Sequence, residues 1–240
     1  NKLRFLSAAI IALLLATPLV FGKTLLFAFV LYRTYWFYLL LLGFGMIFFW
    51  HHQVSGRQLW THSVLRAILV FIGIKLLTDL VGLHPIASLF GNYERMMGWW
   101  LWLWLFIFAI MLLAIVRDER DWRRVLACAL AVGAAVTAYG LLQRFGFVAR
   151  IRDIDPRLFS TVGNPGFLAG YLLLTFWLGL LVVKNSAGYW RAMIAGGCAL
   201  LLVGLAYTGT RGAWLGLLAG VVVSAMVFFA SRHASRHHFN

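Results

Sequence analysis

The chain has 240 residues, of which 63% are hydrophobic and only 12% are charged, and its mean hydropathy is +0.89. A soluble globular domain carries about 25% charged residues, so this composition excludes that class and places the chain in contact with membrane lipid. The formal net charge of +14 is carried by short basic clusters between apolar runs, which indicates the flanks of membrane spans rather than a nucleic-acid-binding face.

Eight apolar runs are bounded by charged residues, and a helix needs about 20 mostly apolar residues to cross the bilayer. We therefore predict an all-α, polytopic helical bundle with about eight transmembrane helices in a single transmembrane domain over residues 1–240. The boundary of the second span is the least defined, because residues 25–32 are also apolar. The predicted spans are Phe5 to Phe21, Tyr35 to Trp50, Val64 to Leu83, Met97 to Val116, Val125 to Phe145, Gly166 to Val183, Ala192 to Thr208 and Gly212 to Ala230.

The distribution of lysine and arginine favours a cytoplasmic N-terminus. With that orientation the inner connections hold twelve of these residues and the outer connections hold eight. The outer loop over residues 146–165 is rich in arginine, which the topology rule disfavours, and an anionic ligand would explain the excess. Asp153 and Asp155 in this loop favour a turn with local salt bridges over a catalytic role.

Each of three outer connections precedes a predicted helix, and each carries a residue suited to cap that helix with an arginine nearby. Because helix N-termini present unpaired N–H groups and a positive dipole, this pattern indicates an anion-binding site. Pro165 suits the first position of its helix, and Gly209 suits the end of the preceding one. The pairs are Asn92 with Arg95, Asn164 with Arg157, and Thr210 with Arg211.

Two further patterns concern the spans themselves. Glycines recur every four residues in two of them, at Gly166 and Gly170 and at residues 212, 216 and 220, which predicts close helix packing. Lys75 and Asp79 are four residues apart, so we expect an ion pair, with a proton or ion pathway as the alternative. Cys128 and Cys198 fall inside predicted spans, where we expect them to be packing residues.

Four motifs in sequence order resemble the O-antigen ligase and polymerase superfamily of bacterial inner membranes. The resemblance covers residues 70–230. The sequence departs from the family pattern at Gly166, where a second asparagine is more usual after Asn-Pro. The motifs are GNYERMMGWW at 91–100, YGLLQRFG at 139–146, RLFSTVGNPGFLAGYL at 157–172 and TGTRGAWLGLLAG at 208–220.

The resemblance implies a multi-pass glycosyltransferase of the inner membrane that uses neither metal nor cofactor. It would move a glycan from undecaprenyl pyrophosphate to a lipid, glycan or protein acceptor at the periplasmic face. Arg211 is then the main candidate for the pyrophosphate contact, with Arg157 and Arg95 in support, and Asn164, Thr210 and Ser160 as further substrate-binding residues. The general base would be a histidine of a loop beyond Asn240, so the chain is expected to be an N-terminal part of the catalytic unit.

Two other classes of function stay open. The arginine cluster could bind an anionic solute in a transporter or flippase, although such proteins carry charged or broken helices near the bilayer midplane. The chain could also be a non-catalytic subunit of a polysaccharide-export complex. The resemblance favours the enzyme over both alternatives.

Overall fold

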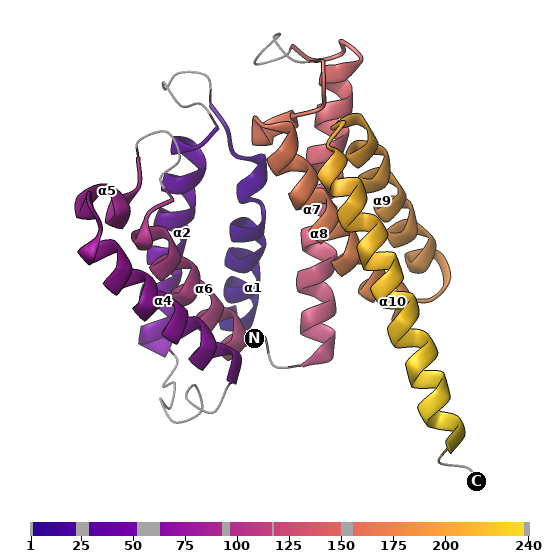
Figure 1. Ribbon diagram of the computed structural model, residues 1–240, viewed down its shortest axis with the longest axis horizontal. Helices are drawn as coiled ribbons and strands as arrows, with labels where there is room; N and C mark the ends of the chain where they lie inside the picture. The colour runs from indigo at the N-terminus through magenta and orange to yellow at the C-terminus, as the bar shows by residue number, and fades with distance from the viewer. Residues whose placement is uncertain are drawn as a thin grey trace. The chain divides into compact units, whose positions relative to one another are not determined.

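The computed structural model describes residues 2–22, 29–51, 63–92, 97–116, 118–149 and 156–237, and all regular structure in these ranges is helical (Figure 1). The expected all-α class is confirmed. The chain divides into two compact units, which we call unit 1 (Asn1–Val132) and unit 2 (Gly133–Asn240).

Among the described residues, four helices are long and apolar enough to cross a membrane. They confirm a helical membrane protein, and they coincide with the last four spans expected from the sequence. Their bounds are Glu119–Arg144 for α7, Pro165–Lys184 for α8, Gly188–Tyr207 for α9 and Arg211–His237 for α10, of which Arg211–Ala230 forms the apolar span.

The expectation of eight spans is wrong for the described part of the chain, where four helices meet the length and composition of a span and α1, α4 and α6 are too short or too charged. A helix rises about 1.5 Å per residue, so the 14 residues of α1 and the 17 of α6 fall short of a bilayer core of about 30 Å. α4 carries three charged residues, Arg66, Lys75 and Asp79. The bounds in unit 1 are Lys2–Leu15 for α1, Leu31–His51 for α2, Ser63–Val81 for α4, Pro85–Phe90 for α5 and Trp99–Ile115 for α6.

The charged stretch at residues 117–124, expected to be a connection, belongs mostly to α7. That helix begins at Glu119, and Glu119 and Asp121 lie in its first turn. Carboxylates in the first turn interact favourably with the positive end of the helix dipole, which favours a helix start there. Arg124 forms an ion pair with Asp121 at 3.0 Å.

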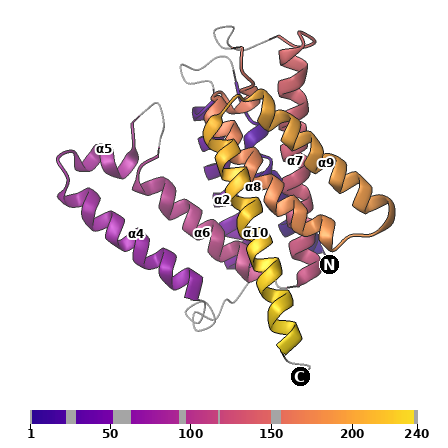
Figure 2. The ribbon, with the colours of Figure 1, turned by 45° about the vertical axis from the view of Figure 1, so that its right-hand side comes forward.

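In unit 1, α1 packs against α2, and α2 packs against α6. α6 also packs against α4, and the short α5 contacts both of these helices (Figure 2). The sequence did not predict α5, whose six residues begin with Pro85 at the first helical position. The buried core of this unit comes from α1, α2 and the C-terminal end of α6. Its residues are Ile11, Leu14, Leu41, Phe44, Phe48, Met111 and Val116.

Aromatic side chains make many of the contacts between the helices of unit 1. Ring centroids lie 6.1 Å apart between Phe37 and Phe108, 5.5 Å between Tyr38 and Trp104, and 5.4 Å between Phe71 and Trp102. Such tilted and edge-to-face pairs add about 0.5–1.5 kcal/mol beyond the area they bury. Large rings therefore fill the space between these helices.

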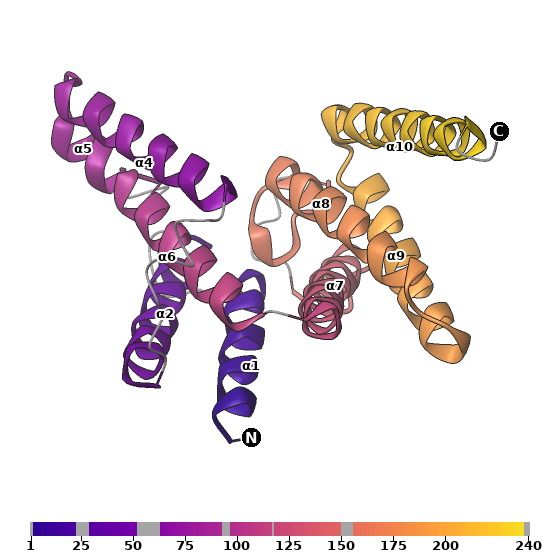
Figure 3. The same cartoon turned by 90° about the horizontal axis from the view of Figure 1, so that it is seen from below.

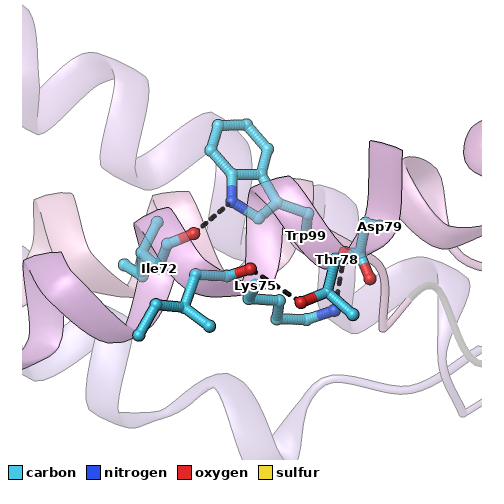
Figure 4. Close-up of polar contacts among 6 residues, drawn as sticks. Ile72, Lys75, Thr78, Asp79 and Trp99 are labelled. Atoms are coloured by element: carbon cyan, nitrogen blue, oxygen red, sulfur yellow. Dashed lines mark hydrogen bonds and ion pairs between the residues drawn. The ribbon is translucent and has the colours of Figure 1, made fainter. Parts of the chain in front are cut away.

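The expected ion pair on α4 is confirmed (Figure 4). Lys75 Nζ lies 2.7 Å from Asp79 Oδ2, and the two side chains are 25% and 13% exposed. Trp99 of α6 donates its indole N–H to the carbonyl oxygen of Ile72 at 3.0 Å. The pair offsets the cost of placing two charges on an otherwise apolar helix and lies beside the contact between α4 and α6.

In unit 2, α8 packs against both α9 and α10 (Figure 3), and small residues allow the helices to approach closely. A Cβ atom on Gly133 of α7 would lie 2.9 Å from Thr175 of α8. One on Gly204 of α9 would lie 2.5 Å from Thr137 of α7. Both positions therefore require glycine for the observed packing.

The glycine pattern predicted for packing is confirmed only in part. Gly216 and Gly220 of α10 face Leu173 and Trp177 of α8 at distances that leave no room for a side chain. Gly170 and Gly212 have nothing within 4 Å of an added Cβ atom, and Gly166 meets only its own helix cap. The four-residue periodicity identified the close contacts of Gly216 and Gly220 in α10. The contacts of Gly133 and Gly204 depend instead on which helices are neighbours.

Candidate functional site

Three segments meet at one end of unit 2: the C-terminal end of α7, residues 156–164 before α8, and the turn between α9 and α10. The backbone N–H of Leu158 donates to the carbonyl oxygen of Tyr207 at 2.9 Å. The ring of Tyr207 lies edge-on to Phe145, with centroids 6.0 Å apart. Four helix ends are thereby held together at this end of the unit.

Asn164 is the N-cap of α8, as predicted, and Pro165 occupies the first helical position. Asn164 Oδ1 accepts hydrogen bonds from the N–H groups of Gly166 at 2.8 Å and Phe167 at 3.3 Å. Two of the amides at this helix start are therefore satisfied by the cap. The helix still contributes its positive dipole to the site.

The turn between α9 and α10 contains the expected glycine, and Thr210 directly precedes α10. Gly209 adopts a positive φ of 62°, which favours glycine, and α10 begins at Arg211. The hydroxyl of Thr210 donates to the carbonyl oxygen of Pro165 at 3.4 Å, and so connects this turn to the start of α8. The backbone carbonyl of Thr210 accepts the N–H of Ala213 at 3.1 Å.

Ser160 lies in a short 3-10 turn, η2 (Ser160–Val162), and has a positive φ of 50° although it is not glycine. Its side chain is 1% exposed and donates to the carbonyl oxygen of Val136 in α7 at 2.5 Å. A Cβ atom on Gly140 would lie 2.8 Å from the Ser160 Cβ. Ser160 thus fixes the loop against α7 in a conformation of higher energy, and its expected role in substrate binding stays a prediction.

The structure brings two of the three predicted arginines to this end of unit 2. Arg157 packs over the turn between α9 and α10, because a Cβ atom added to Gly209 would lie 3.3 Å from the Arg157 Cδ atom. Arg211 lies two residues after Gly209. Both side chains are exposed. Arg95 lies outside the described residues.

The predicted cap at Asn92 is wrong. The N-cap residue of α6 is Gly98, six residues further along the chain, and a glycine has no side chain that could cap the helix. A Cβ atom on Gly98 would meet the backbone of Leu89, Phe90 and Gly91, so close packing of that backbone determines where α6 begins.

A very small open recess lies between the end of α7 and the segment before α8. Among the described residues, two guanidinium groups and one buried amide line it, together with apolar and backbone atoms. The buried amide is that of Gln143, which is 3% exposed. The lining residues are Gly140, Gln143, Arg144, Arg157, Leu158 and Phe159.

The charged side chains described around the recess are basic. Within the described residues of unit 2, from 133 to 149 and from 156 to 237, the sequence contains no aspartate or glutamate. Asp153 and Asp155 lie outside the described residues, as does the salt-bridged turn expected there. Across the described ranges of both units, no group of three or more His, Cys, Asp or Glu residues could hold a metal ion.

The sequence indicated most of this cluster but missed Arg144 and Gly140. Arg144 is the last residue of α7, where a basic side chain also suits the negative end of the helix dipole. Its place beside Arg157 depends on how the loop folds back onto α7. The signal for Gly140 was its position within the YGLLQRFG motif.

The fold is that of a helical membrane protein, and arginine side chains gather at one end of unit 2. Comparison with models of protein families, with curated proteins and with solved structures finds no match to this chain.

Proposed function

We propose that this protein is a membrane glycosyltransferase similar to O-antigen ligases and polymerases. It would transfer a glycan from undecaprenyl pyrophosphate to a lipid, glycan or protein acceptor. The observation that carries the proposal is the meeting of Arg157, Arg211 and the starts of α8 and α10 at one end of unit 2. Three of the four motifs that resemble the superfamily form this end of the unit.

The chemistry requires stabilisation of negative charge on the departing pyrophosphate. A guanidinium group binds two phosphate oxygens at once and stays charged beside an apolar wall. The cap on Asn164 already occupies two amides of α8, so the arginines supply the hydrogen bonds and the helix starts supply their dipoles. Preorganised donors of this kind favour the transition state, in which the charge develops.

The acceptor must lose a proton, and the resemblance implies that a histidine acts as the base for this step. The described residues contribute donor binding in this proposal. Metal ions and cofactors have no part in it.

We place the arginine cluster at the periplasmic face of a bacterial inner membrane, with the N-terminus in the cytoplasm. The opposite end of unit 2, at the turn between α8 and α9, exposes Tyr189 and Trp190 with Lys184 and Arg191 beside them. Aromatic and basic residues are typical of a cytoplasmic membrane interface. Labelling of single cysteines introduced at Tyr189 and Asn164 from either side of intact cells tests this orientation, and labelling of both from the same side would contradict it.

The test of the function is glycan transfer by the intact protein, reconstituted with a lipid-linked oligosaccharide. Arg211→Ala should lower the rate about 10²- to 10³-fold, the usual effect of removing one preorganised donor, and Arg211→Lys should retain part of it. Arg191→Ala, at the opposite end of unit 2, is the matched control and should transfer at the wild-type rate.

Full activity of both Arg211 variants would remove the pyrophosphate role. Movement of the lipid-linked glycan across the membrane without transfer would identify a flippase. Neither transfer nor movement would favour a non-catalytic subunit.

A further inference from the structure

Thr208 places a buried hydroxyl at the point where α9 turns into α10. It is the C-cap residue of α9 and is 0% exposed. Residues 208–210 alone separate the end of α9 at Tyr207 from the start of α10 at Arg211. The direction of α10, and with it the place of Arg211, therefore depends on this short turn.

The Thr208 hydroxyl makes one hydrogen bond to each side of the turn. It donates to the carbonyl oxygen of Leu205 in the last turn of α9 at 2.7 Å, and it accepts the backbone N–H of Thr210 at 3.4 Å. The second bond holds the amide that directly precedes Arg211. One hydroxyl thus joins the end of α9 to the residue before α10.

Neighbouring segments hold the outside of the same turn. The carbonyl oxygen of Tyr207 accepts the N–H of Leu158 at 2.9 Å, and the hydroxyl of Thr210 donates to the carbonyl oxygen of Pro165 at 3.4 Å. These bonds attach the turn to the loop before α8 and to the start of α8. The Thr208 hydroxyl is the contact that orders the turn from within.

We propose that Thr208 is a positioning residue for Arg211, in which the buried hydroxyl sets the turn and thereby the place from which the guanidinium group reaches the pyrophosphate. The inference rests on the proposed function for the ligand of Arg211. Thr208 itself is buried and makes no contact with substrate in this role. A hydroxyl is required because it both donates and accepts, which an aliphatic side chain of similar size cannot do.

Removal of the hydroxyl should displace the start of α10. Thr208→Val keeps nearly the same volume but loses both hydrogen bonds, so the amide of Thr210 loses its acceptor. A misplacement of about 1 Å, even one caused away from the reacting atoms, can lower a rate about 100-fold. A small shift of Arg211 is therefore large enough to measure.

The experiment measures glycan transfer by the intact protein over a range of concentrations of a lipid-linked oligosaccharide donor. Thr208→Val should raise the KM for the donor about 10-fold and leave the KM for the acceptor unchanged. Thr208→Ser keeps the hydroxyl and should restore most of the wild-type donor KM.

Thr137 of α7 provides a matched control. It is also 0% exposed, and its hydroxyl donates to the carbonyl oxygen of Gly133 in its own helix at 2.8 Å. Thr137→Val makes the same chemical change away from the turn. It should leave the donor KM unchanged, whatever its effect on the melting temperature.

A purely structural role would overturn the proposal. In that case Thr208→Val would lower the melting temperature and leave the donor KM unchanged. A serine variant with the same donor KM as the valine variant would overturn it as well. If Thr208→Val does not fold, Thr208→Ala replaces it, and equal donor KM values for the alanine and serine variants would contradict the positioning role.

The positioning role and the proposed enzyme can fail separately, because hydrogen exchange at the Thr210 amide reports on the turn without a transfer assay. Faster exchange in Thr208→Val than in Thr208→Ser, with no transfer by the wild type, would support the geometric role of Thr208 and contradict the enzyme. Transfer by Thr208→Val with an unchanged donor KM would support the enzyme and contradict the positioning role.

Discussion

The helices of unit 1 and those of unit 2 pack by different means. In unit 1, aromatic rings such as Phe108 and Trp102 fill the space between helices. In unit 2, Gly133 and Gly204 bring backbones so close that an added Cβ atom would collide with a neighbour. Glycine contacts of this kind let two helix backbones approach closely and leave no space for a side chain.

The close glycine contacts of unit 2 lie beneath the candidate site. A site built from several loops needs its supporting helices fixed to within a fraction of an ångström. The glycine contacts provide this support along α7, α8 and α9, and the loop hydrogen bonds of Ser160 and Thr210 extend it to the helix ends.

Substitution at a glycine contact should produce the largest loss of stability. Gly204→Val places a branched side chain against Thr137 and Leu172 and should destabilise unit 2 by about 1–3 kcal/mol through overpacking. Thermal unfolding in detergent measures the effect. Gly196→Val is the matched control on the same helix, where an added Cβ atom meets nothing within 4 Å, and an equal loss there would contradict the packing argument.

The buried serine tests how the loop is held against α7. Ser160→Ala removes the hydrogen bond to Val136 and keeps a side chain at positive φ, so it should cost about 1 kcal/mol. Ser160→Gly also loses the bond but relieves the backbone strain, and should be closer to neutral. The two unfolding midpoints should therefore differ, with the alanine variant lower; the reverse order would show that φ at residue 160 carries no strain.

The ion pair of unit 1 should have the smallest effect. Asp79→Asn leaves Lys75 without its carboxylate, whereas the double variant Lys75→Gln with Asp79→Asn removes both charges. The interaction free energy from this double-mutant cycle should be about 0.5–1 kcal/mol, since the pair is only partly buried. A coupling near zero would mean that lipid or water solvates Lys75 equally well without Asp79.

Local chemistry determined several features that can be recognised from the sequence. The cap of Asn164 with Pro165, the positive φ of Gly209 and the pair of Lys75 with Asp79 each depend on residues within a few positions of one another. The apolar runs identified the four helices that are long enough to cross a membrane. Hydrophobic length and short-range hydrogen bonding suffice for such predictions.

Features that depend on distant residues could not be predicted in the same way. The start of α6 at Trp99 follows from backbone packing at Gly98, which replaced the expected cap at Asn92. The strained Ser160 and the recess shared by Arg144 and Arg157 arise because the loop before α8 folds back onto α7. Composition and short-range pattern therefore determined a helical membrane protein and the capped start of α8, whereas tertiary packing decided which arginines lie together, because that depends on contacts between residues far apart in the chain.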